Sequence, residues 1–234
     1  MSKVLRLVVA SGVGVTLLAL GLLLSSRESA HAQGRSNAPV VVLSGSVDDA
    51  LERAYALPAN WPYDPASRTI HPENASLVFP VRLSDEQWLS LLPSTEYYIL
   101  RQHGTERAFT HELNHNTRQG IYYSRATGQP LFRSEDKYDS GTGWPSYTRP
   151  INADAIVYIE DNSLWSRRIE VVDSLSGSHL GHVFPDGPLP TRQRYCINGA
   201  ALVFVAYGED PPPVLQEIRQ AIARSAGATA HAAP

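Results

Sequence analysis

The stretch Arg194-Tyr195-Cys196-Ile197-Asn198 has the pattern of a short β-strand and contains the only cysteine of the 234-residue chain. Alternate side chains of a strand lie on one face, so Arg194, Cys196 and Asn198 are expected together, with the two residues between them on the other face. An arginine beside a cysteine favours the thiolate, which is the nucleophilic form. The alternative is a buried, unreactive cysteine that packs as a small apolar residue. The strand by itself leaves both interpretations open.

The sequence around this strand continues the same pattern from Thr105 onwards, because short apolar segments alternate with glycine and proline. The expected strands are residues 120–124, 130–133, 155–160, 167–172, 179–184, 194–198 and 201–207. Several short strands separated by turns indicate antiparallel pairing. We therefore predict a mainly β fold of two antiparallel sheets, a small sandwich or barrel, with two helices on its N-terminal side.

The first of these helices is expected to begin at Asp85. Ser84 and Gln87 have the spacing of a capping box, and Leu83 and Trp88 occupy the two positions of a hydrophobic staple. These four residues together predict a helix start.

The second helix is predicted to follow directly, since Pro93 ends the first one. Ser94 or Thr95 is expected to cap it, and Gly104 is expected to supply the left-handed residue at its C-terminal end. A short C-terminal helix is predicted over residues 214–224, and the alanine-rich residues 225–234 are expected to be disordered.

The N-terminus has the order of an export signal. Lys3 and Arg6 precede an apolar run over residues 7–24, and Ala30-His31-Ala32 resembles a cleavage site. Residues 1–32 are therefore interpreted as a signal peptide or an uncleaved membrane anchor, which predicts a periplasmic, secreted or inner-membrane-anchored protein.

Three further segments are expected. Residues 33–80 form an extension rich in proline, asparagine and serine, which is either a spacer or a wrap around the core, with a short helix at residues 47–56. Residues 81–210 form the main domain, and residues 211–234 follow it.

The chain is 43% apolar and 18% charged with a net charge of −3, which argues against general binding to nucleic acid.

Polar side chains suited to catalysis gather in three places: a Gly-rich turn at residues 139–146, the His179-Leu180-Gly181-His182 strand with Asp186 after it, and the Cys196 strand. His179 and His182 would face opposite sides of a regular strand, so a shared site requires a bulge, which Gly181 can supply. Metal binding by these histidines lacks a third ligand at suitable spacing. The other histidines of this region are interpreted as solvated: His103, His111 and His115.

Taken together, these segments resemble the methionine-R-sulfoxide reductases, the MsrB family, over residues 83–208. The resemblance rests on six separated motifs in the family's order: residues 104–107, 128–132, 138–147, 179–184, 186–188 and 194–198. It implies a β-rich fold of two antiparallel sheets. It also implies a peptide-methionine (R)-S-oxide reductase, in which Cys196 attacks the sulfoxide sulfur and becomes a sulfenic acid.

The resemblance assigns roles to further residues. Arg194 would favour the thiolate, His182 would deliver a proton to the sulfoxide oxygen, and Trp144 would form an aromatic wall for the substrate's methyl group. A core role for Trp144 is the alternative. The residues expected to orient His182 are His179, Asp186 and Asn198.

Two departures from the family pattern concern cysteine. Many members bind a structural zinc through two Cys-x-x-Cys pairs, whose positions here hold Ser124, Thr127, Asp173 and Ser176. Without thiolates, we expect no structural zinc, and we expect hydrogen bonds between these side chains in its place.

The second departure is Thr142, which stands where many members have a resolving cysteine. No internal disulfide can form, so an external thiol is expected to reduce the sulfenic acid, either a thioredoxin-like protein or a small thiol. No cofactor is expected, and the expected substrates are oxidised proteins or peptides.

Two other functions remain as alternatives. The first is a catalytically inactive MsrB-like binding module that recognises oxidised methionine or a partner. The second is a Cys-His hydrolase or acyl transferase that would use Cys196, His182 and Asn198.

Overall fold

The computed structural model describes residues 40–42, 69–70, 76–164 and 166–231, all of which belong to one compact unit, Val40–Pro234. The signal or anchor predicted over residues 1–32 and the helix predicted over residues 47–56 lie outside the described residues. Within the described ranges, no helix combines the length and the apolar character that crossing a membrane requires.

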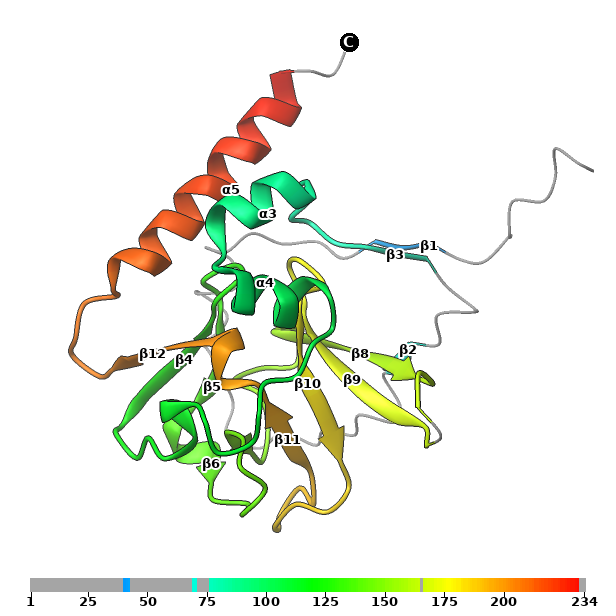
Figure 1. The fold of residues 1–234 in the computed structure, drawn as a ribbon, viewed down its shortest axis with the longest axis vertical. Helices are drawn as coiled ribbons and strands as arrows, with labels where there is room; N and C mark the ends of the chain where they lie inside the picture. Colours follow the sequence, from blue (N-terminus) through cyan, green and yellow to red (C-terminus); the bar gives the residue numbers. More distant parts are fainter. Residues whose placement is uncertain (1–39, 43–68, 71–75, 165, 232–234) are drawn as a thin grey trace, which may run out of the picture. The chain divides into compact units, whose positions relative to one another are not determined.

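Two antiparallel sheets form the body of this unit, which confirms the predicted mainly β fold (Figure 1). The larger sheet has the strand order β2-β8-β9-β10-β11-β7-β6, and the smaller has the order β12-β4-β5. The strands of the larger sheet are β2 (Thr69–Ile70), β6 (Lys137–Tyr138), β7 (Ser146–Tyr147), β8 (Ile156–Asp161), β9 (Arg168–Asp173), β10 (His179–Phe184) and β11 (Arg194–Ile197). The strands of the smaller sheet are β4 (Gly120–Ser124), β5 (Pro130–Arg133) and β12 (Leu202–Ala206).

All seven predicted strands are present, and each end lies within one residue of its predicted position. The strands that the sequence did not indicate have two or three residues each, too few to show a period. Two of them, β6 and β7, complete the edge of the larger sheet beside β11.

The described parts of the extension pair with other strands. β1 (Val40–Val42) runs parallel to β3 (Ser76–Val78), and β2 adds a parallel edge strand to β8 of the larger sheet. Just after β3, the Val81 amide donates to the Leu175 carbonyl (2.8 Å). Among the described residues of the extension, the β2–β8 pairing joins it to the main domain, and the choice between spacer and wrap stays open.

The first helix, α3 (Asp85–Leu91), begins as predicted. Ser84 Oγ accepts from the Gln87 amide (3.3 Å), and Gln87 Oε1 accepts from the Ser84 amide (2.8 Å), so the capping box is complete. Trp88 is fully buried, which anchors the helix to the core.

The second helix, α4 (Ser94–Arg101), differs from its prediction at both ends. Its N-cap is Pro93, which makes no side-chain cap, so the expected cap by Ser94 or Thr95 was wrong. At the C-terminal end, His103 adopts the left-handed conformation (φ 55°) in place of Gly104. Gly104 instead packs against the half-exposed Tyr98 ring, and a Cβ there would lie 2.3 Å from that ring in its present position.

The C-terminal helix α5 (Pro213–His231) is longer than the predicted residues 214–224. The expected disorder from residue 225 was therefore wrong as far as His231, since alanine-rich sequence has high helix propensity. Helices α3, α4 and α5 gather at one end of the two sheets (Figure 1).

The inner face of β11 joins the core. Tyr195 and Ile197 are fully buried, and the Tyr195 hydroxyl lies 3.0 Å from that of Tyr158 on β8. The strand therefore turns its apolar residues inward, as the alternation predicts, and its outer face is left for Arg194 and Cys196.

Candidate active site

The outer face of the larger sheet carries a row of polar side chains that crosses four strands. Glu170 on β9 pairs with His182 on β10, His182 pairs with Cys196 on β11, and Cys196 pairs with Ser146 on β7. Side chains of paired antiparallel residues lie on one face about 5 Å apart at Cβ. The register alone therefore sets the thiol beside the imidazole of His182.

A pocket of about 140 Å³ opens over this row. Its lining residues are Thr105, Trp144, Arg168, Gly181, His182, Phe184, Cys196 and Asn198. This volume is well below the roughly 300 Å³ at which small-molecule pockets usually begin. The pocket is therefore suited to the end of one side chain.

A bulge between His179 and Gly181 confirms the irregularity expected in β10. It brings both histidines to the same side, where their rings meet edge to face with centroids 5.4 Å apart. Only glycine fits at position 181, because a Cβ there would lie 2.0 Å from the carbonyl oxygen of Cys196.

Cys196 is partly buried at the floor of the pocket. Burial raises the pKa of its thiol. The charge of Arg194 and the hydroxyl of Thr142 lower this pKa, but by less than burial raises it. Thr142 Oγ1 lies 4.0 Å from Cys196 Sγ. Arg194 acts in the predicted direction, but the net shift is opposite to the expected thiolate. Cys196 is therefore a neutral thiol near pH 7.

Arg194 is held by Asp186 through two hydrogen bonds, from Nε to Oδ1 (2.8 Å) and from Nη2 to Oδ2 (2.9 Å). Its guanidinium also lies over the Phe184 ring, 4.4 Å from the centroid. The expected role of Asp186 in orienting His182 is therefore corrected: its carboxylate orients Arg194.

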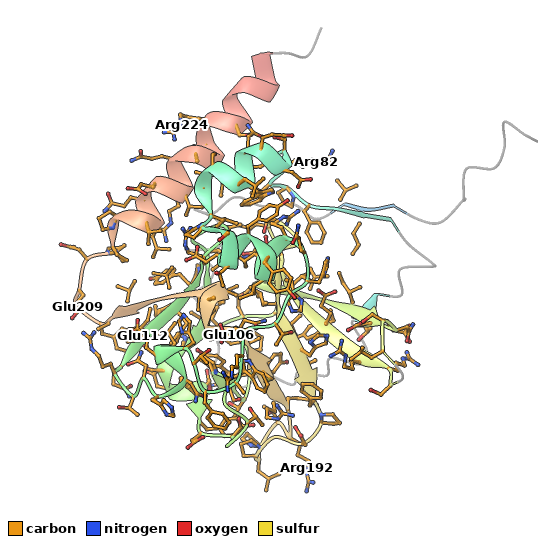
Figure 2. The ribbon with its side chains drawn as sticks, viewed as in Figure 1. Arg82, Glu106, Glu112, Arg192, Glu209 and Arg224 are labelled. Carbon is orange, nitrogen blue, oxygen red and sulfur yellow. The ribbon has the colours of Figure 1, made fainter. Side chains whose placement is uncertain are left out.

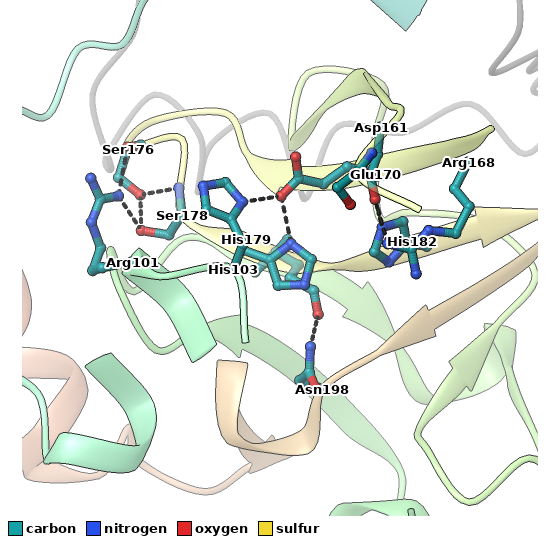
Figure 3. A network of polar contacts seen from close by, with 12 residues as sticks. Arg101, His103, Asp161, Arg168, Glu170, Ser176, Ser178, His179, His182 and Asn198 are labelled. Atoms are coloured by element: carbon teal, nitrogen blue, oxygen red, sulfur yellow. Dashed lines mark hydrogen bonds and ion pairs between the residues drawn. The ribbon is translucent and has the colours of Figure 1, made fainter. Parts of the chain in front are cut away.

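His182 is oriented by Asp161, since its Nε2 lies 2.8 Å from Asp161 Oδ2 (Figure 3). Arg168 also donates to this carboxylate oxygen (2.6 Å). Burial acts to raise the pKa of Asp161, but hydrogen bonds from Ser163, His182 and Arg168 outweigh it and hold the pKa well below its usual value. Asp161 is therefore ionised and accepts the hydrogen of Nε2.

The imidazole of His182 is neutral near pH 7. Burial lowers its pKa, and the hydrogen bond to Asp161 offsets this only in part. With Nε2 as the donor to Asp161, Nδ1 is the basic nitrogen of the ring.

His179 and His103 both contact Glu170. The Nδ1 atoms of the two rings lie 2.6 Å and 2.7 Å from Glu170 Oε1, respectively (Figure 3). Burial acts to raise the pKa of Glu170, but these two hydrogen bonds outweigh it and lower the pKa to about 2. His103 was expected to be solvated, but its ring is hydrogen-bonded to Glu170.

His111 also has a partner, because its Nδ1 accepts from the Leu113 amide (3.2 Å), whereas His115 is exposed as expected.

Trp144 and Asn198 are joined through Glu106, which lies on the loop after α4 beside the short helix η4 (Gly199–Ala201) (Figure 2). Trp144 Nε1 donates to the Glu106 carbonyl (3.1 Å), and Asn198 Oδ1 accepts from the Glu106 amide (3.0 Å). Asn198 Nδ2 donates to the Leu180 carbonyl (3.0 Å). These bonds of Asn198 therefore go to backbone groups, and Asn198 positions the wall of the pocket.

The residues at the family's zinc positions do come together, between the β4–β5 and β9–β10 turns. Thr127 Oγ1 donates to Asp173 Oδ2 (2.7 Å), which confirms the expected hydrogen bond across the two turns. Asp173 Oδ1 accepts from the Leu175 and Ser176 amides, and in the other turn Ser124 Oγ accepts from the Ala126 and Thr127 amides. This buried set of oxygen atoms does not fit a tetrahedral thiolate site, and the absence of zinc here stays a prediction.

The sequence interpretation missed several residues of the site: Glu106, Asp161, Arg168, Glu170 and Phe184. A signal was present for two of them, because Arg168 and Glu170 alternate with Ile169 and Val171 in a predicted strand. Charges at alternate positions of an otherwise apolar strand indicate a polar, functional face.

Comparisons with known proteins agree with this geometry. Residues 92–206 match the model of the SelR domain family. A peptide methionine sulfoxide reductase MsrB from Methanosarcina mazei is 53% identical over 124 residues, which cover 53% of this chain and 89% of that protein. The MsrB of Methanosarcina barkeri is 51% identical over 124 residues (53% and 87%), and an MsrA/MsrB protein of Vibrio cholerae is 52% identical over 125 residues (53% and 33%).

Proposed function

The chain belongs to the MsrB family of peptide methionine sulfoxide reductases, and we propose that it reduces methionine-R-sulfoxide by attack of Cys196 on the sulfoxide sulfur. It is an oxidoreductase that acts on a sulfur group. The observation that carries the mechanism is the pairing of Cys196 with His182 at the floor of a side-chain-sized pocket.

The first step transfers one oxygen atom. The Cys196 sulfur bonds to the sulfoxide sulfur, the sulfoxide oxygen gains a proton, and this oxygen then passes to Cys196. Methionine leaves with its sulfur reduced, and Cys196 becomes a sulfenic acid, oxidised by two electrons. The proton that the oxygen gains equals the one that the thiol loses, so no further proton is required.

His182 is suited to moving that proton. At rest the proton is on the Cys196 thiol, and the neutral imidazole has a basic Nδ1. His182 takes the proton as the thiol attacks and delivers it to the sulfoxide oxygen. The ionised Asp161 stabilises the imidazolium formed in between, and Arg194 stabilises the thiolate.

Substrate choice is assigned to the pocket wall. Trp144 offers an aromatic face to the methyl group of the sulfoxide, with Phe184 also in the lining. With the methyl group held against Trp144, the sulfoxide oxygen points to His182 in only one of the two epimers. We assign this epimer as R. The pocket admits one side chain, so oxidised methionine in a peptide or protein fits with its backbone outside.

An external thiol completes the cycle, because Cys196 is the only cysteine of the chain. One thiol condenses with the sulfenic acid and releases water, and a second reduces the mixed disulfide. A thioredoxin-like protein or a small thiol is the proposed reductant. Export is also part of the proposal, because residues 1–32 have the order of a signal sequence; a fusion of these residues to a compartment-sensitive reporter tests it.

The test uses purified protein with dithiothreitol and each sulfoxide epimer, followed by chiral chromatography. We expect loss of the R epimer only and no activity after Cys196→Ser; activity that survives this substitution would contradict the mechanism. A sulfenic-acid trap followed by mass spectrometry should label Cys196. Binding without turnover would instead indicate the inactive module, and an acyl adduct on Cys196 would indicate a hydrolase or acyl transferase.

A further inference from the structure

Three side chains converge at one end of the polar row, away from the thiol. His103 comes from the end of α4, Glu170 from β9 and His179 from β10. Both imidazole Nδ1 atoms point at the same oxygen, Glu170 Oε1, at 2.7 Å and 2.6 Å (Figure 3). The three potential ligand atoms lie within 4.8 Å of one another.

Two imidazoles and one carboxylate are a donor set that suits zinc and other divalent transition metal ions. The Glu170 side chain is only 10% exposed, so its carboxyl group is held largely out of water. Hydrogen bonds from imidazoles compensate the charge of such a carboxylate in part, and a bound cation would compensate it more fully.

The His179 ring is buried beside the cluster. It is 2% exposed, and its Nε2 has no hydrogen-bond partner among the described residues. The hydrogen bonding of this ring is therefore confined to Nδ1, the nitrogen that faces Glu170 and would bind the metal.

His103 gives access to the cluster, because its side chain is 63% exposed. Tetrahedral zinc with bonds of about 2.1 Å requires ligand atoms about 3.4 Å apart, so the two N–O distances must lengthen by roughly 0.7 Å. An exposed ring that follows a helix end can make such a shift.

We propose that His103, Glu170 and His179 form a binding site for a divalent transition metal ion such as Zn²⁺, with water completing the coordination. This site differs from the family's zinc position, where Thr127 and Asp173 are hydrogen-bonded to each other. The proposed metal site is separated from His182 only by the His179 ring, which packs edge to face against the His182 imidazole.

Calorimetric titration with Zn²⁺ and absorption spectroscopy with Co²⁺ test the proposal on the full chain. Cys196→Ser is the background, so that the thiol cannot supply a ligand. We expect one ion per chain, and His103→Asn, which tolerates the left-handed backbone, should weaken binding by at least ~10-fold. The matched control is His115→Asn, which removes an exposed histidine outside the cluster and should leave the affinity unchanged.

A second measurement needs no change to the cluster. Histidine ring NMR signals of the Cys196→Ser protein should shift on Zn²⁺ addition at His103 and His179 and stay unchanged at His115. The proposal is wrong if the protein binds no Zn²⁺, if His103→Asn binds it equally well, or if the shifts fall on other histidines.

Discussion

Cys196 combines a buried position with a cationic neighbour, and the two act on its thiol in opposite directions. Burial raises the pKa and is the larger effect, while Arg194 and Thr142 lower it. A neutral resting thiol keeps the proton that the sulfoxide oxygen needs, and it also protects the cysteine from oxidants, which react with the thiolate.

The first prediction concerns the pH dependence of this thiol. Alkylation of Cys196 by iodoacetamide should be slower at pH 7 than that of free cysteine and should rise about tenfold per pH unit up to a raised pKa. Arg194→Ala removes a charge that lowers the pKa, so its rate at a given pH should fall further. Faster alkylation of Arg194→Ala would contradict the assignment of Arg194.

The second prediction concerns Asp161. Asp161→Asn removes the charge that holds His182 and stabilises its imidazolium, so kcat should fall by at least ~10-fold, compared with about 100-fold for His182→Ala. Because the hydrogen bond to Asp161 raises the pKa of His182, NMR titration should show a lower pKa in the variant. If the pKa of His182 and kcat were both unchanged, Asp161 would have only a structural role.

At the scale of elements, two turns with the same hydrogen-bond pattern clamp the sheets together. The Gly128 amide donates to the Ser124 carbonyl and the Gly177 amide to the Asp173 carbonyl, both at 2.8 Å. Both glycines have positive φ, as the turns require. Side-chain oxygen atoms of Ser124 and Asp173 each accept hydrogen bonds from the amides two and three residues later, so the turns keep their shape without thiolates.

The third prediction tests the bond between these turns. Thr127→Val keeps the side-chain shape but leaves Asp173 Oδ2 without its hydroxyl donor in a buried place. The free energy of unfolding should fall by about 1–3 kcal/mol, measured by urea denaturation. Thr117→Val, the same substitution at an exposed loop position, is the control and should change it by less than about 0.5 kcal/mol.

Prediction from sequence succeeded for elements with a clear local signal. The capping box placed the start of α3, and alternation with turn residues placed seven strands. It failed at the end of α4, where His103 accepts a positive φ. Local propensity favours glycine there, but the glycine stands one residue later, against the Tyr98 ring, and the contact of His103 with Glu170 depends on β9.

At the scale of the whole molecule, a single cysteine among 234 residues determines how turnover must proceed. The fourth prediction follows from it. Without a reductant, the protein should release one methionine per chain and stop, with the sulfenic acid remaining on Cys196. Several methionines per chain without added thiol, measured by rapid quench, would show that another group resolves the intermediate.

The sequence by itself determined that Cys196, the proposed nucleophile, is the only thiol and that it lies on the outward face of its strand, because these depend on residue identity and on the two-residue period of a strand. Only the tertiary structure decided the partners. Asp161 reaches His182 from 21 positions away, and His103 reaches Glu170 from 67 positions away. It also decided the direction of the Cys196 pKa, because the desolvation that outweighs Arg194 comes from the packing of the strands and loops around the thiol.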